Sequence, residues 1–143
     1  MCLLLSPFCR AQQNKLVVHP AEQIAIKRGA SVSQTLSVAV LPGFHVNSDK
    51  PKDEFLIPLK LTWTSGPLEA QNIAYPKPEE IMVGNQSLTV FTGNFQIQTK
   101  FLAPSNGPAG TAAMTGKLRY QACNNEMCFR PSSVEVHVPV SIE

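Results

Sequence analysis

The sequence predicts an all-β protein, an antiparallel β-sandwich of the immunoglobulin-like kind. Apolar and polar residues alternate at period two along many short segments, and turn residues recur between those segments. Twelve prolines in 143 residues, with almost no helical spacing, argue against an all-α fold. Eight or nine strands without intervening helices favour a sandwich or a small barrel, of which the immunoglobulin-like sandwich is the commonest.

Length and charge limit the functions that remain. A chain of 143 residues and 15.6 kDa fits one domain, whose core needs neither a metal nor a disulfide for stability. Lysine and arginine number 12 against 10 acidic residues, and the charges are scattered singly. No apolar run approaches the roughly 18 residues of a membrane helix. We therefore expect a soluble globular domain with no membrane span and no nucleic-acid partner.

The start of the chain differs from the rest and indicates export. It opens with an apolar stretch (MCLLLSPF), after which Cys9 and Ala11 place small side chains at the spacing of a signal-peptidase site before Gln12. A charged initial region is missing. We interpret residues 1–11 as a truncated signal peptide, in preference to a frayed terminus, and residues 12–143 as the mature domain.

Nine segments carry the strand pattern. In chain order they cover residues 15–18, 23–27, 31–41, 56–63, 70–75, 87–91, 95–102, 114–123 and 133–142. Turn residues separate them at Pro42-Gly43, Ser65-Gly66-Pro67, Gly84-Asn85, Gly93-Asn94 and across residues 104–110. These interruptions indicate separate short strands joined by turns.

The final segment, residues 133–142, alternates most strictly. Its apolar side chains fall on one face, at Val134, Val136, Val138, Val140 and Ile142. Pro139 lies on the other face and cannot donate a ladder hydrogen bond. We therefore expect this strand at a sheet edge, or a break in its ladder.

Two segments depart from the strand pattern. Residues 47–54 (NSDKPKDE) are the most polar stretch, which predicts a surface loop. Residues 76–84 (PKPEEIMVG) form a proline-bounded excursion that carries the apolar residues Ile81 and Met82. Because exposed apolar groups usually mark a contact, we expect the tip of this excursion to rest on another surface.

Cys123 and Cys128 carry the most specific chemistry. They flank a hairpin-like connection with a polar spacer, and opposed positions of an antiparallel pair bring β-carbons within about 4.5–5.5 Å, so a disulfide is geometrically feasible. Closing so small a ring stabilises the fold by roughly 2 kcal/mol, against about 4.7 kcal/mol for a hundred-residue loop. This weak structural return shifts weight toward a redox role. Most cysteine pairs of exported proteins are nevertheless inert cross-links, so the residues alone still favour a structural disulfide.

Metal binding and hydrolysis have less support. Zinc would need four ligands, whereas the hairpin supplies two sulfurs. The soft ligands Cys128 and Met127 would suit a Cu(I) ion, with Met82 or Met114 from another part of the chain as a further ligand. Methionines of β proteins, however, usually fill cores. The histidines are scattered, at positions His19, His45 and His137. A hydrolase elbow, a phosphate loop and a metalloprotease helix are not found in the sequence.

The residues around the cysteines resemble a known family. The run Tyr120-Gln121-Ala122-Cys123 is followed by Cys128, by Pro131 and by the alternating valine strand. Upstream landmarks agree, namely Gly43 to Ser48 (GFHVNS), Lys50-Pro51, Leu56 to Leu59 and Tyr75-Pro76. Over residues 15–142 the chain resembles the N-terminal periplasmic domain of the bacterial thiol:disulfide interchange protein DsbD.

The resemblance implies an immunoglobulin-like periplasmic domain that acts as one component of a protein-disulfide reductase. It would relay electrons from a membrane-embedded DsbD-type donor to thioredoxin-fold partner proteins, with no cofactor and no metal. Cys128 matches the thiolate that attacks the partner's disulfide, and Cys123 matches the residue that resolves the mixed disulfide. The surroundings of the pair would come from Tyr120, Glu126, Phe129 and Pro131.

The resemblance also implies a cap that shields the cysteines. The matching stretch is 80–84, with Ile81, Met82 and Val83, and its tip lacks the aromatic ring of the family. The alternative for Met82 is ordinary core packing. A carboxylate close to Cys128, such as that of Glu126, would disfavour its thiolate. Beside the redox relay stands a second hypothesis, an exported non-catalytic β-sandwich binding module, copper-handling included, with a structural disulfide.

Overall fold

The computed structural model of the protein describes residues 15–143 and confirms the all-β prediction. The proposed signal peptide at residues 1–11, with its cleavage point before Gln12, lies outside the described residues. Residues 15–143 contain twelve strands and no helix, and the strands form three sheets of four strands each.

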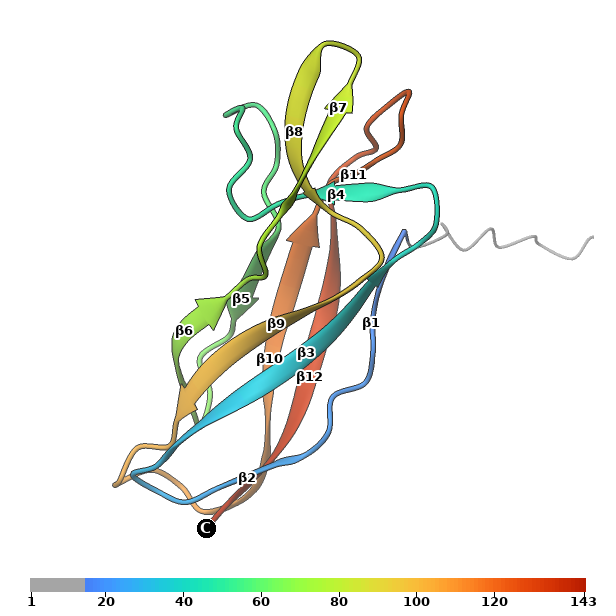
Figure 1. Ribbon diagram of the computed structural model, residues 1–143. Helices are drawn as coiled ribbons and strands as arrows, with labels where there is room; N and C mark the ends of the chain where they lie inside the picture. The colour runs from blue at the N-terminus through green and yellow to red at the C-terminus, as the bar shows by residue number, and fades with distance from the viewer. Residues whose placement is uncertain (1–14) are drawn as a thin grey trace, which may run out of the picture.

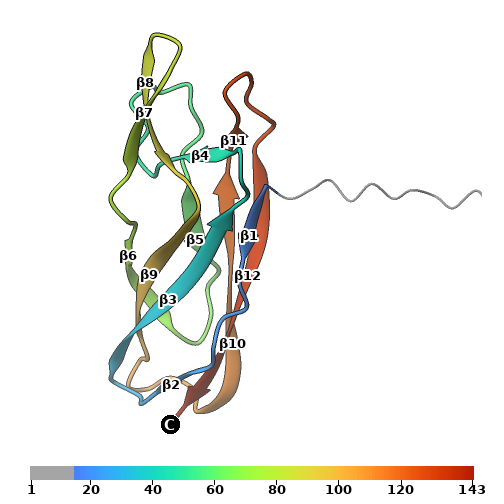
Figure 2. The ribbon, with the colours of Figure 1, turned by 45° about the vertical axis from the view of Figure 1, so that its right-hand side comes forward.

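Two long sheets form the layers of a sandwich (Figures 1 and 2). The first has the order β1 (Leu16–Val18), β3 (Ser31–Val40), β9 (Asn94–Leu102) and β6 (Glu69–Ala74). The second has the order β2 (Ile24–Ile26), β12 (Ser132–Ile142), β10 (Gly110–Tyr120) and β5 (Lys60–Trp63). Neighbouring strands run antiparallel, except that β2 runs parallel to β12.

A third sheet lies at the end of the sandwich away from the C-terminus (Figure 1). Its strands follow in the order β11 (Ala122–Cys123), β4 (His45–Asn47), β8 (Gln86–Phe91) and β7 (Glu79–Val83). β11 pairs with β4 over two residues only, and so does β4 with β8. The segment that carries the cysteines therefore belongs to the least extensive part of the fold.

Apolar side chains from both long sheets fill the space between the two layers. The largest fully buried ones include Leu36, Ile97, Phe101, Met114, Leu118 and Val138. Trp63 packs edge-on against Phe101 with ring centroids 5.0 Å apart, and its indole N–H donates to Thr99 Oγ1 over 3.0 Å. A β-carbon at Gly116 would lie 2.9 Å from Trp63 Cε3. Glycine there lets the indole lie against β10.

The valine strand confirms its predicted pattern. In β12, Val136, Val138, Val140 and Ile142 are buried and Val134 is half-buried. The register with β10 runs through Pro139 without a break, and β2 covers the other edge only from Val140 onward. The expectation of an edge strand or a broken ladder is therefore wrong for β12 as a whole, which is an inner strand with an unbroken register to β10. Pro139 is accommodated because β2 pairs with β12 only from Val140 onward.

Two predicted strands have different limits in the structure. The segment 56–63 is a strand only from Lys60, because Leu59 donates its N–H to Ser48 and the carbonyl of Ile57 accepts from Asn47 Nδ2. These backbone groups form their hydrogen bonds with a loop carbonyl and a side-chain amide, and not with a neighbouring strand. The segment 114–123 begins earlier, at Gly110, and is interrupted at Gln121, where the chain leaves the second sheet for the third.

Two strands were not predicted at all. β4 is short and buried at each of its three positions, so it has no alternation to detect. β7 lies in the excursion 76–84, whose prolines indicated a loop; it pairs with β8 from Glu79 to Val83 instead. Gly84 (φ 62°) and Asn85 form the two-residue turn between β7 and β8, where positive φ favours glycine. The expected cap loop is therefore a β-hairpin.

Candidate functional site

Cys123 and Cys128 form a disulfide that closes a short hairpin at the third sheet. The two residues lie directly opposite each other, with α-carbons 4.0 Å apart. Hydrogen bonds flank the pair on both sides, from Asn124 N–H to the Met127 carbonyl and from Phe129 N–H to the Ala122 carbonyl, each 2.9 Å. The cysteines thus occupy a non-hydrogen-bonded pair, the position in which opposed side chains approach most closely.

Asn124 holds the turn between the cysteines. Its side-chain Oδ1 accepts hydrogen bonds from the N–H groups of Glu126 and Met127, both over 2.8 Å. An asparagine side chain that bonds its own downstream backbone in this way replaces a backbone turn. The hairpin geometry therefore depends on local hydrogen bonds as well as on the disulfide.

The two cysteine residues differ in their exposure to solvent. Cys123 is 3% exposed, whereas Cys128 is exposed, as is the neighbouring Met127 at 55%. A nucleophile that approaches from solvent can reach Cys128, whereas Cys123 is covered by protein. An external thiol can therefore attack the disulfide at Cys128 and not at Cys123.

Side chains at the base of the hairpin hold it against the rest of the domain. Phe129 and Phe44 pack edge-on with centroids 5.8 Å apart, and Lys15 Nζ lies 4.2 Å from the Phe129 ring centroid. Gln121 Nε2 donates to the Phe129 carbonyl over 3.3 Å, and Gln121 Oε1 accepts from Asn47 Nδ2 over 3.2 Å. The hairpin is thereby tied to β4 and to the first residues of the chain that the structure describes.

The predicted neighbours of the cysteine pair lie in different environments. Phe129 is half-buried beside the hairpin, whereas Glu126 and Pro131 are exposed. Tyr120 ends β10 and is buried, as part of the sandwich core. Of these four residues, Phe129 makes the ring contact with Phe44 at the base of the hairpin.

The expected cap residues form one arm of the β7–β8 hairpin. Met82 is 65% exposed, which excludes the alternative that it fills the core, and Ile81 and Val83 are half-buried. In this structure the arm leaves Cys128 exposed. Figures 1 and 2 show the β7–β8 hairpin, the cysteine hairpin and the loop between β4 and β5 projecting from the same end of the sandwich.

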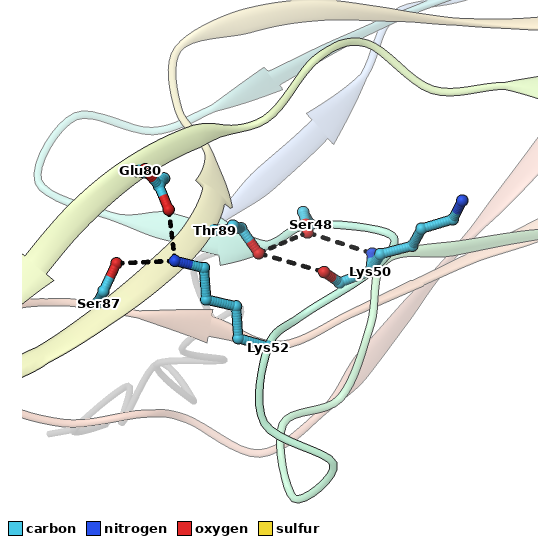
Figure 3. Close-up of polar contacts among 6 residues, drawn as sticks. All are labelled: Ser48, Lys50, Lys52, Glu80, Ser87 and Thr89. Carbon is cyan, nitrogen blue, oxygen red and sulfur yellow. Dashed lines mark hydrogen bonds and ion pairs between the residues drawn. The ribbon is translucent and has the colours of Figure 1, made fainter.

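Polar contacts fasten the loop 48–59 to the β7–β8 hairpin (Figure 3). The hydroxyls of Ser48 and Thr89 are hydrogen-bonded over 3.0 Å, and Thr89 Oγ1 donates to the Lys50 carbonyl over 3.3 Å. Lys52 forms an ion pair with Glu80 and donates to Ser87 Oγ over 3.1 Å. The loop and the predicted cap are therefore connected structurally.

Phe55 is a residue of this end that sequence reasoning missed. It lies in the loop 48–59 and is 83% exposed, the most exposed large apolar side chain of residues 15–143. It falls between the predicted loop 47–54 and the predicted strand 56–63, so it was assigned to neither. An aromatic residue directly after a run of charged residues was the available signal. Phe55, Met82 and Met127 give each of the three projections one exposed apolar residue.

His45 is the second residue that sequence reasoning missed. It lies in β4, directly opposite Cys123 of β11, and is buried. Its burial lowers the pKa of the imidazole below 6.5. The sequence could not single out His45 among its three scattered histidines, because only the pairing of β4 with β11 places it opposite a cysteine.

The described residues offer little to a metal ion. In residues 15–143 no three or more His, Cys, Asp or Glu side chains form a group that could hold one. Met114, a candidate Cu(I) ligand, is buried in the sandwich core and so is not available to Cys128. Over the same stretch there is no helix long and apolar enough to cross a membrane.

A surface groove of about 880 Å³ lies away from the disulfide. Its walls come from the outer face of β3 and β9, including Ser37 and Gln96, and from the connection that carries Tyr75 and Lys77. Neither cysteine lines it. Disulfide exchange with a protein needs an accessible sulfur and not an enclosed pocket, so the groove does not argue against the hairpin as the site.

Comparison with known proteins gives the family of the chain. The family model described as thiol:disulfide interchange protein DsbD, N-terminal, matches residues 12–139. No curated protein matches the chain.

Two solved structures share the fold. The N-terminal periplasmic domain of ScsB from Proteus mirabilis is 15% identical with a TM-score of 0.59, over 86% of this chain and 44% of that one. The DsbD N-terminal domain of Neisseria meningitidis in the reduced form is also 15% identical, with a TM-score of 0.52, over 80% of this chain and 82% of that one. The chain thus spans less than half of the ScsB structure. These likenesses confirm the immunoglobulin-like β-sandwich.

Proposed function

The chain belongs to the family of DsbD N-terminal domains, a family of thiol-disulfide exchange, and we propose that it relays electrons through Cys123 and Cys128. The donor would be a membrane-embedded protein of the DsbD type, and the acceptors thioredoxin-fold proteins of the periplasm. Export by the segment 1–11 would bring the domain to that compartment.

The observation that carries this proposal is the unequal exposure of the two disulfide-bonded residues. A donor thiolate can attack the exposed Cys128 Sγ, which breaks the disulfide and leaves Cys123 as the thiolate that takes up a proton. A second donor thiol then releases Cys128. The donor has become a disulfide, and the domain carries two electrons as a dithiol.

Delivery of the electrons reverses the roles. The Cys128 thiolate attacks the disulfide of an acceptor, forms a mixed disulfide and expels one acceptor thiolate. Cys123 then attacks Cys128 Sγ, which restores the internal disulfide and releases the second acceptor thiol. The acceptor gains two electrons and two protons. Cys128 is therefore the attacking residue and Cys123 the resolving one.

The surroundings of Cys128 suit exchange that depends on a docked partner. Residues 15–143 contain no helix, so no helix N-terminus stabilises a Cys128 thiolate as it does in thioredoxin-like proteins. Reaction with stray oxidants is accordingly slow. Ile81, Met82 and Val83 would restrict access further when the β7–β8 hairpin bends toward the cysteines, and a partner would displace it.

Docking would use the apolar residues of the three projections. Phe55, Met82 and Met127 are exposed at the end of the sandwich that carries Cys128. Exposed large apolar side chains that gather at one end of a domain mark an interaction surface. Phe55 would supply the aromatic group that the tip of the cap lacks.

The experiment is a trap of the mixed disulfide. We mix the Cys123→Ser variant, in reduced form, with an oxidised thioredoxin-fold domain and analyse the products by non-reducing electrophoresis and mass spectrometry. The matched control is Cys128→Ser. We expect a one-to-one covalent adduct with Cys123→Ser and none with Cys128→Ser.

The alternative function predicts a different result. If the chain is a binding module with a permanent cross-link, neither variant accumulates an adduct with the thioredoxin-fold domain. Equal trapping by both variants would contradict the assignment of Cys128 as the attacking residue.

A further inference from the structure

His45, Cys123 and Cys128 form a row across the third sheet. His45 of β4 is directly opposite Cys123 of β11, and Cys123 is directly opposite Cys128 on its other side. β4 and β11 lie side by side in Figure 1. Directly opposed residues of antiparallel pairs place their side chains on one face, with β-carbons about 4.5–5.5 Å apart. His45, Cys123 and Cys128 therefore lie on one face of the sheet, with Cys123 between the other two.

The imidazole of His45 has an unused nitrogen. His45 is 5% exposed, and its Nε2 has no hydrogen-bond partner. Only one other buried side-chain nitrogen or oxygen within residues 15–143 lacks a partner, Oε1 of Gln34 in β3. A buried polar atom without a partner costs stability, so its presence beside a reactive group calls for a functional explanation.

The resolving step needs a proton acceptor at this place. Cys123 must act as a thiolate, but its site is closed to solvent, and burial disfavours the charged form of a thiol. Water is not free to take up the proton there. A neutral imidazole can take it, and the lowered pKa of His45 keeps this imidazole neutral at pH 7.

We propose that His45 accepts the proton of the Cys123 thiol while Cys123 resolves the mixed disulfide, an inference that rests on the proposed function. The Cys123 S–H bond breaks, and its proton moves to the imidazole. The sulfur attacks Cys128 Sγ, the Cys123–Cys128 bond forms, and the bond from Cys128 to the partner breaks. The departing partner thiolate receives the electron pair and, from the imidazolium or from water, a proton.

Few charges surround the imidazole. The two strands that pair with β4 carry no charged side chain, since β11 is Ala122–Cys123 and β8 is Gln86–Phe91. Charged groups on flanking segments include Asp49, which follows β4, Lys15, which lies over the rings of Phe44 and Phe129, and Glu126 and Arg130 of the cysteine hairpin. Burial is the cause of the lowered pKa of His45.

The test separates the two steps of exchange. Reduced protein is mixed with an equimolar amount of 5,5′-dithiobis(2-nitrobenzoate), and release of the yellow thiolate is followed by stopped-flow absorbance between pH 5.5 and 9. The first phase reports attack by Cys128, and the second reports resolution by Cys123. Wild type is compared with His45→Gln, and with His137→Gln as a matched control, because His137 lies far along β12 with a side chain 62% exposed.

We expect the second phase of His45→Gln to be about a hundredfold slower than that of wild type near pH 6.5, the usual size of a general-base effect. The difference should narrow toward pH 9, where thiolate forms without a base. The first phase of every variant and both phases of His137→Gln should match wild type. Identical pH profiles of the second phase in wild type and His45→Gln would overturn the role of His45.

A second measurement on the wild-type protein keeps the proposal testable if His45→Gln fails to fold. The ¹⁵N chemical shift of His45 Nε2 is recorded by NMR with the disulfide closed and reduced. A shift on reduction supports contact between the imidazole and the Cys123 thiol, and an unchanged shift overturns it. The reagent reacts with any accessible thiol, so this test can fail while the partner trap succeeds, and the reverse.

Discussion

The sandwich body, which consists of the two long sheets, and the cysteine end, which consists of the third sheet and its projections, differ in the extent of strand pairing and in the burial of apolar side chains. In the body, β10 and β12 pair over eleven positions and β3 and β9 over nine, with apolar side chains from each strand in a common core. At the cysteine end, β4 pairs over two positions with each neighbour, and three large apolar side chains are exposed. We therefore expect the body to supply the stability and the fold to survive opening of the disulfide.

Removal of a core side chain should have the largest effect and should leave the chemistry intact. Phe101 is fully buried against Trp63, so Phe101→Ala is expected to lower the free energy of unfolding by about 3–5 kcal/mol. Urea unfolding gives this value, and alkylation of the reduced, folded variant gives the reactivity of Cys128. An unfolding free energy within 1 kcal/mol of wild type would contradict the assignment of stability to the body.

Opening the disulfide should have a smaller effect. The closed ring contains six residues, from Cys123 to Cys128, so reduction is expected to lower the free energy of unfolding by about 2 kcal/mol. Urea unfolding with and without dithiothreitol measures the difference, with the double variant Cys123→Ser/Cys128→Ser as the control. A reduced protein that is unfolded in the absence of urea would show that the body depends on the bond.

Acid should weaken the fold through His45. Because burial lowers the pKa of His45 in the folded state, the unfolded state binds a proton first as the pH falls below about 6.5. The stabilisation is complete above that pH and is lost as the pH falls toward the folded pKa, by up to about 1.4 kcal/mol per pH unit.

His45→Gln should flatten this dependence, whereas His137→Gln should not. Urea unfolding between pH 5 and 8 makes the comparison. The same pH dependence in His45→Gln and wild type would mean that another group is responsible.

Truncation of the cap should have the smallest effect. Met82→Ala is expected to raise the rate at which iodoacetamide alkylates reduced Cys128 by only a few fold. The increase is small because Cys128 is already exposed with Met82 in place. Val17→Ala is the matched control, an exposed apolar residue of β1. An equal rate in Met82→Ala and wild type would remove shielding from the role of the β7–β8 hairpin.

The sequence predicted most of the body and less of the cysteine end. Strict alternation, as in Ser132–Ile142, is set by one buried face, and the structure confirms it. β4 was missed because all three of its residues are buried and show no alternation, and β7 was missed because its proline-bounded segment indicated a loop. The cysteine hairpin followed from two cysteines and a polar spacer. The roles of His45 and Phe55 could not be predicted from the sequence, because they depend on contacts between distant segments.

The reduction potential of the Cys123–Cys128 pair tests the relay most directly. It is measured by equilibration of the purified domain with glutathione or dithiothreitol buffers and quantification of both forms by mass spectrometry. A relay must exchange with its donor and acceptors, so we expect a potential above about −300 mV, in the range of exchange proteins. A potential far below about −300 mV, typical of structural disulfides, would contradict the account.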